Sequence, residues 1–140
     1  MSRLSILTIC SLLLSVVTMI GCNHAGEATN RTELQRLRSG ELEVVLLSPR
    51  DALRHGSDTF VIEFRSLSNG SLIDVGTVRS SANMPMPGMT MFGTIDVQRT
   101  NVVGRYAADA KLEMGGTWRM TIEWDGPMGH GSLNFSRSVQ

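Results

Sequence analysis

Hydrophobic and polar residues alternate along much of the C-terminal two thirds of this chain. In residues 117–124, four apolar side chains occupy every second position: Trp118, Met120, Ile122 and Trp124. Residues 104–114 repeat the pattern, with Tyr106 on the apolar face and charged residues between the apolar ones. A period of two is typical of strands that bury one face. We therefore predict two amphipathic strands whose apolar faces belong to one core.

The same alternation predicts five further strands. Two are clear, at residues 60–65 and 132–139, and three are weaker, at residues 41–47, 72–78 and 91–97. Turns are expected where Gly, Pro and Asn gather between them. Seven short antiparallel strands at intervals of roughly ten residues are typical of an immunoglobulin-like β-sandwich. We expect this all-β domain to span residues 41–140, with Tyr106, Trp118 and Trp124 in its core.

Tyr106 follows Gly104 and Arg105 at the start of a late strand. This position resembles a tyrosine corner, in which the hydroxyl binds upstream backbone. The alternative interpretation is that Tyr106 is one more amphipathic core residue.

The N-terminus has the pattern of an export signal. Arg3 is followed by an apolar run from Leu4 to Ile20, which ends in Gly21-Cys22. A basic start, an apolar stretch and small residues before a break are typical of secretory signals. Because the break falls at a cysteine, we predict a lipoprotein signal peptide over residues 1–21 and lipidation of Cys22. A plain membrane anchor or an ordinary cleaved signal is the alternative.

A polar tether is expected over residues 22–40. Asn23 follows the cysteine, and in a Gram-negative organism this residue favours the periplasmic face of the outer membrane. Cys22 is the only cysteine after the signal, since Cys10 lies inside it. The mature domain is therefore expected to have no disulfide, and its lipid anchor makes the membrane its first partner.

Composition narrows the function. Lys and Arg together number 13, and so do Asp and Glu, which gives a formal net charge of zero. Nucleic-acid-binding domains usually carry a basic surface, so we expect no nucleic-acid partner. The sequence also lacks the catalytic motifs GxSxG and HExxH, a P-loop and a dinucleotide fingerprint. We therefore expect a protein that is not an enzyme.

Candidate chemistry is concentrated in one segment. Met84, Met86, Met89 and Met91 lie within eight residues. Thioether sulfur is a soft, neutral ligand that suits Cu(I), and Pro85 and Pro87 in the same segment indicate an edge or a loop. The alternative is that these methionines pack into the core or form an apolar docking patch. Met114 and Met120 are expected on buried faces instead.

Histidine could complete a copper site, and His55 and His130 both lie in predicted connections. If seven strands alternate in direction, the connection holding His55 lies at the same end of the domain as the methionines. The connection holding His130 then lies at the other end. An additional strand at residues 82–86 would reverse this assignment.

Three segments together resemble the YtkA-like family: Asn83–Met91, Gly104–Tyr106 and Met114–Trp118, in that order. The resemblance covers residues 41–140 and implies a small exported or lipid-anchored β-sandwich, similar in outline to the FixH family. Some members occur beside copper export or cytochrome oxidase assembly systems. The resemblance therefore implies a role in metal homeostasis, with Cu(I) as the candidate ion. The alternative is a module that docks on an efflux or oxidase-assembly complex without binding metal.

Overall fold

The computed structural model describes residues 30–140, and the regular elements within that range are all strands. The eight strands are β1 (Thr32–Ser39), β2 (Leu42–Ser48), β3 (Gly56–Ser66), β4 (Thr77–Met86), β5 (Met89–Arg99), β6 (Arg105–Leu112), β7 (Gly116–Gly126) and β8 (Gly129–Val139). The predicted all-β, antiparallel class is confirmed, with one strand more than expected. No helix in the described range is long and apolar enough to cross a membrane. The predicted signal peptide and Cys22 lie outside the described residues.

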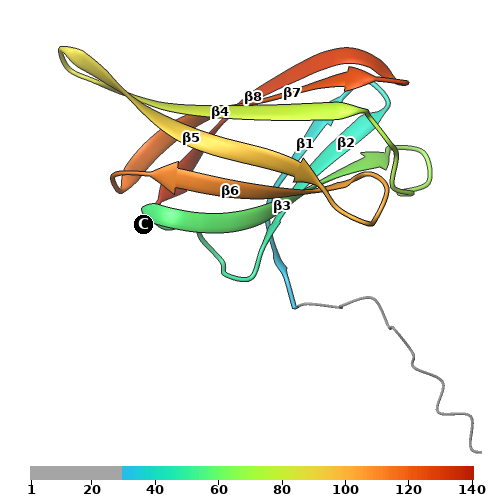
Figure 1. Ribbon diagram of the computed structural model, residues 1–140, viewed down its shortest axis with the longest axis horizontal. Coiled ribbons are helices and arrows are strands. Elements are labelled where there is room, and N and C mark those ends of the chain that lie inside the picture. The colour runs from blue at the N-terminus through green and yellow to red at the C-terminus, as the bar shows by residue number, and fades with distance from the viewer. Residues whose placement is uncertain (1–29) are drawn as a thin grey trace, which may run out of the picture.

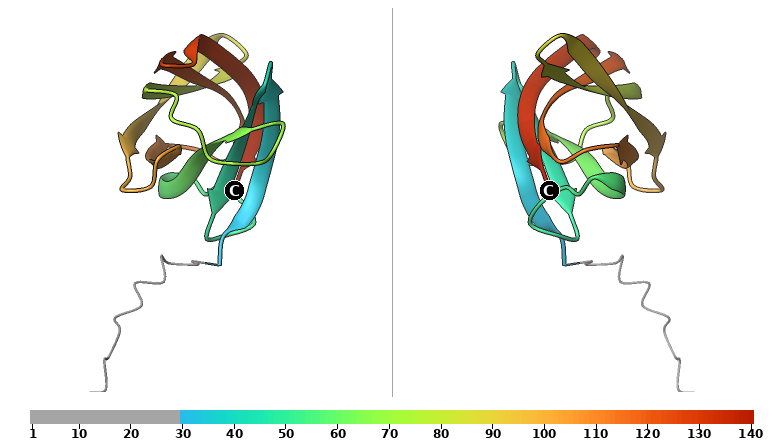
Figure 2. Two further views of the ribbon diagram at one scale, coloured as in Figure 1. Left: turned by 90° about the vertical axis from the view of Figure 1, so that its right-hand side faces the viewer. Right: turned by 90° about the vertical axis from the view of Figure 1, so that its left-hand side faces the viewer.

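The strands form one sheet with the order β1-β2-β3-β6-β5-β4-β7-β8, and each neighbouring pair is antiparallel. The sheet curls over until its two ends approach each other, so its halves face one another as the layers of a sandwich (Figures 1 and 2). Arg137 of β8 spans the junction and donates to the carbonyl of Leu34 in β1 at 2.6 Å. The loop after β2 also reaches β8, where Leu53 forms a bridge with Val139. The result is a nearly closed barrel.

The core fills the inside of the curled sheet. Its largest fully buried side chains include Trp118, Phe64, Leu46, Ile62 and Met120. Phe64 makes edge contacts with both Tyr106 and Trp124, with ring centroids 5.6 and 5.5 Å away. Such contacts combine burial of large apolar areas with favourable ring geometry.

Tyr106 is buried, and its hydroxyl donates to the carbonyl of Gly76 at 2.8 Å. Gly76 lies 30 residues upstream, in the connection between β3 and β4. The hydroxyl therefore binds upstream backbone as predicted, but it reaches a distant connection, whereas a tyrosine corner binds backbone a few residues away. Burial raises the pKa of Tyr106, so this donor stays protonated at neutral pH.

The expected tether over residues 22–40 is wrong for its second half, because Thr32–Ser39 forms β1 against β2. The pairing register shifts between Glu33 and Gln35, which marks a bulge. The bulge places Leu34 and Leu37, three positions apart, against the core. This spacing breaks the period of two, so the alternation of apolar and polar residues does not reveal the strand.

The expected strand at residues 72–78 is also wrong in position. Leu72 makes only an isolated bridge with Arg65, and the strand runs from Thr77 to Met86. Met114 is 43% exposed, because β6 ends at Leu112 and Met114 lies in the turn that follows. Its expected burial was wrong.

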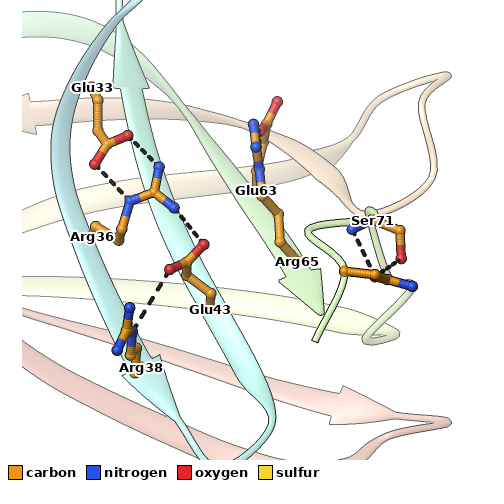
Figure 3. A network of polar contacts seen from close by, with 8 residues as sticks. Glu33, Arg36, Arg38, Glu43, Glu63, Arg65 and Ser71 are labelled. Carbon is orange, nitrogen blue, oxygen red and sulfur yellow. Dashed lines mark hydrogen bonds and ion pairs between the residues drawn. The ribbon is translucent and has the colours of Figure 1, made fainter. Parts of the chain in front are cut away.

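Charged side chains pair on the outer face of β1, β2, β3 and β6, and Figure 3 shows those of β1, β2 and β3. Arg36 pairs with both Glu33 and Glu43. Glu63 is fully buried, and Arg65 and Arg105 both donate to it, the latter at 2.7 Å. Burial opposes ionisation of Glu63, but the two arginines outweigh it and hold the pKa of its carboxyl below the usual range.

Candidate functional site

The methionine segment forms the tip of the β4–β5 hairpin. Pairing of β4 with β7 stops at Asn83, and pairing of β5 with β6 begins only at Thr94. Residues 84–93 therefore pair only within their own hairpin and extend past the neighbouring strands, as the green and yellow ribbon in Figure 1 shows. Pro85 fits this place, because on the β7 side of β4 no partner needs the missing N–H at this position.

A two-residue turn sets the register of the tip. Pro87 and Gly88 connect the strands, and Gly88 has φ of 78°. Pro followed by a residue with positive φ fits a type II turn. The residues on either side of the turn, Met86 and Met89, then face each other across the hairpin.

The register brings all four methionines together on one face. Met84 pairs with Met91, and Met86 pairs with Met89. Side chains directly opposite each other have Cβ atoms about 4.5–5.5 Å apart, and residues two positions apart share a face. The four side chains therefore form two adjacent cross-strand pairs, which we call the thioether ladder.

Exposure increases from the base of the ladder to its tip. Met84 is only 7% exposed, Met86 and Met91 are half-buried and pack against the core, and Met89 is 58% exposed. The two interpretations of the methionines, core packing and exposed thioethers, therefore apply to different ends of the ladder. Its inner end is part of the core, and its outer end faces solvent.

Gly116 makes room for the base of the ladder. A Cβ on Gly116 would lie 3.0 Å from the sulfur of Met84, and the residue has φ of 135°. Any larger residue there would press on that sulfur and strain the backbone. The first residue of β7 therefore lies against the buried end of the ladder.

The two candidate histidines lie at opposite ends of the barrel. His55 precedes β3, whose first residue pairs with the last residue of β6, at the ladder end. Its backbone N–H donates to the carbonyl oxygen of Gln140 at 2.7 Å, and its Nδ1 lies 3.0 Å from the same oxygen. His130 pairs with Asp125 at the turn of the β7–β8 hairpin, at the other end. The eighth strand, β1, precedes the seven predicted strands, so it does not change which connections share an end of the barrel. The two histidines therefore lie at the ends that alternating strands predicted.

Thioethers are the main soft donors at the ladder end. Within residues 30–140, no three His, Cys, Asp or Glu side chains are grouped so that they could hold a metal ion. A hard or borderline cation such as Mg²⁺ or Zn²⁺ therefore has no preformed ligand set in this range. The arrangement is chemically suited to a soft monovalent ion instead.

Two residues near the ladder were not predicted as functional. Phe92 is 75% exposed on the opposite face of the hairpin, and Met114 is exposed in the β6–β7 turn. The sequence does contain a signal for Phe92, because it is out of phase with Met91 and Ile95 on the apolar face. Single exposed apolar residues are normal on protein surfaces, so Phe92 marks a contact surface only in combination with neighbouring groups.

The comparisons with known proteins agree with this fold. The chain matches the YtkA-like family over residues 36–123, and it belongs to that family. No curated protein matches it. Among solved structures, a DUF4426 family protein from Pseudomonas aeruginosa PAO1 is similar, with a TM-score of 0.55 and 16% identity. That match covers 76% of this chain and 94% of the other.

FetP from uropathogenic Escherichia coli strain F11 is similar as well, with a TM-score of 0.52 and 12% identity over 78% of this chain and 95% of FetP. A copper-bound variant of the same FetP gives a TM-score of 0.47 and 10% identity, over 78% and 97% of the two chains. The likeness to the DUF4426 protein and to the first FetP structure, both below 25% identity, establishes a shared fold alone.

Proposed function

We propose that this protein is an exported, lipid-anchored YtkA-like domain that binds Cu(I) through the thioether ladder and delivers it within the cell envelope. The observation that supports the proposal is the β4–β5 register, which gathers four thioethers on one face of a projecting hairpin. Thioethers prefer Cu(I) to harder ions. They also need no deprotonation, so binding should persist at mildly acidic pH.

The gradient of exposure along the ladder suits delivery. A metal held near Met84 is shielded, Met86 and Met91 are half-buried, and Met89 is open to a second protein. An acceptor with its own soft ligands can approach the tip and exchange ligands one at a time. The chain thus has a binding and carrying role and not a catalytic one. Its acceptor is an efflux or oxidase-assembly complex of the envelope.

A Cu(I) titration with a competing chelator tests the metal site. It uses the detergent-solubilised full chain and a variant in which all four ladder methionines are replaced by Leu. Each Met to Leu change keeps volume and apolarity, at a cost usually below about 1.5 kcal/mol. The variant should fold and lose Cu(I) binding. Met128→Leu is the matched control, because Met128 is 48% exposed at the opposite end of the barrel. Equal Cu(I) affinity in the wild type and the four-Leu variant would contradict the proposal.

The second candidate function is docking without metal, and the exposed Phe92 favours it. Phe92→Ser leaves the ladder intact, so it should leave Cu(I) affinity unchanged while weakening capture of a partner complex. If the four-Leu variant still binds that complex and the wild type binds no Cu(I), docking is the function.

The lipid anchor is tested separately. Labelled palmitate should enter the wild type and be absent from Cys22→Ser. A mature protein whose mass still includes residues 1–21 would contradict lipidation.

A further inference from the structure

A hollow lies on the outer face of β4, β7 and β8. Its volume is about 290 Å³, and its lining residues are Asn83, Arg119, Thr121, Asn134, Phe135 and Ser136. The strand registers place Arg119 directly between Asn83 of β4 and Ser136 of β8. Thr121 and Asn134 form the adjacent row. The lining contains one cationic side chain and no acidic one.

Arg119 differs from the arginines of the other half of the sheet. Arg36, Arg65 and Arg105 all pair with carboxylates, whereas Arg119 takes part in no ion pair within residues 30–140. An exposed guanidinium with five donors in a planar fork is a natural partner for an oxyanion. Its charge is therefore available to a ligand.

The neighbouring side chains supply more donors. The hydroxyl of Thr121 donates to the amide oxygen of Asn134 at 2.6 Å. This contact occupies the acceptor end of Asn134 and leaves its NH₂ group free to donate. With the hydroxyl of Ser136 beside Arg119, the hollow offers a cation and neutral donors from adjacent strands.

We propose that this hollow binds a carboxylate carried by a peptide segment of a partner protein. One guanidinium with neutral donors matches a single negative charge, and the fork geometry matches a planar carboxylate. Phe92 pairs with Asn83 and extends the same row on β5, two strands from Arg119, or about 10 Å at the usual strand spacing. An extended peptide covers that distance in about three residues. The recognised segment therefore has an acidic residue about three positions from an apolar one.

Titrations of the ¹⁵N-labelled full chain in detergent, followed by NMR, test this assignment. The probes are the peptide acetyl-Glu-Ser-Ser-Leu-amide, the same peptide with Gln in place of Glu, sodium acetate and inorganic phosphate. The Glu peptide should shift the Arg119 Nε–H and Asn134 NH₂ signals and bind about threefold to fivefold more tightly than the Gln peptide, as expected for an ion pair at an exposed arginine. Arg119→Gln should abolish that difference. Arg79→Gln, on the same face of β4 but outside the hollow, should preserve it.

Each other outcome overturns the proposal. Equal binding of the Glu and Gln peptides means that no carboxylate is recognised. Phosphate binding as tight as that of the Glu peptide points to a phosphate site instead. If acetate binds as tightly as the Glu peptide, the site recognises a carboxylate and not a peptide segment. Unchanged peptide affinity in a Phe92→Ser variant leads to the same conclusion. Absence of any shift at millimolar probe means that the hollow is not a site.

Discussion

The two halves of the curled sheet have very different outer faces. On β1, β2, β3 and β6, charged groups pair with one another, and Glu43 and Glu63 are buried beneath their arginines. On β5, β4, β7 and β8, Arg119 has no ionic partner among the described residues, Phe92 is exposed, and a hairpin extends past its neighbours. The buried carboxylates of the first half are paired within the fold, whereas Arg119 and Phe92 in the second half are open to other molecules.

This difference separates scaffold from binding surface. A buried carboxylate with two guanidinium partners is costly to disturb, because removing one partner leaves a desolvated charge. An exposed arginine or thioether can exchange water for a ligand at little cost to the fold. Substitutions in the first half should therefore affect stability, and substitutions in the second half should affect binding.

The largest effect is expected in the core, which both halves share. Trp118 is fully buried, and its Nε1 donates to the Met114 carbonyl at 2.9 Å. Trp118→Ala should lower the free energy of unfolding by about 3–5 kcal/mol, measured by urea denaturation. A loss below about 1 kcal/mol would mean that the inner face of β7 is not part of a packed core.

The next effect separates the halves. Glu63→Gln removes the charge that two arginines share and should lower the free energy of unfolding by about 2 kcal/mol. Glu33→Gln is the matched control on the same half of the sheet, because the Glu33–Arg36 pair is exposed and should contribute far less. Equal effects of the two changes would contradict the distinction between buried and exposed pairs.

Acid sensitivity should follow from the same carboxyl. The folded-state pKa of Glu63 lies below its ordinary value of 4.5, so its contribution to stability is fully present above that pH. The contribution is lost as the pH falls below about 4.5 and through the folded-state pKa. Urea midpoints between pH 6 and pH 3 should therefore fall more steeply in the wild type than in Glu63→Gln. Parallel profiles would show that Glu63 is not the group responsible.

Most strands of the fold could be predicted from the sequence, but β1 could not. Strict alternation at residues 117–124 predicted β7 and its buried face, because a period of two survives in any regular strand. β1 was missed because its bulge places Leu34 and Leu37 three residues apart. Local pattern contains no information about a bulge that the partner strand imposes.

The candidate site could also be predicted from the sequence only in part. Four clustered methionines and two prolines predicted an exposed soft-donor segment, but their facing pairs depend on the two-residue turn at Pro87-Gly88. Met86 and Met89 lie symmetrically about that turn, which is a signal that the sequence does contain. The hollow at Arg119 has no such signal, since Asn83, Arg119 and Ser136 meet only through the order of β4, β7 and β8.

The smallest effect on stability should occur at the tip of the thioether ladder. Met89 is 58% exposed, so Met89→Ala should change the free energy of unfolding by no more than about 0.5 kcal/mol, as is usual for surface positions. The same change removes one of four soft donors and should weaken Cu(I) binding measurably in the chelator competition. Met128→Ala, with similar exposure at the other end of the barrel, should change neither quantity. If Met89→Ala costs more than about 1 kcal/mol of stability, the tip is packed like the core. The open half of the sheet would then be as satisfied internally as the charged half, and the contrast between them would not hold.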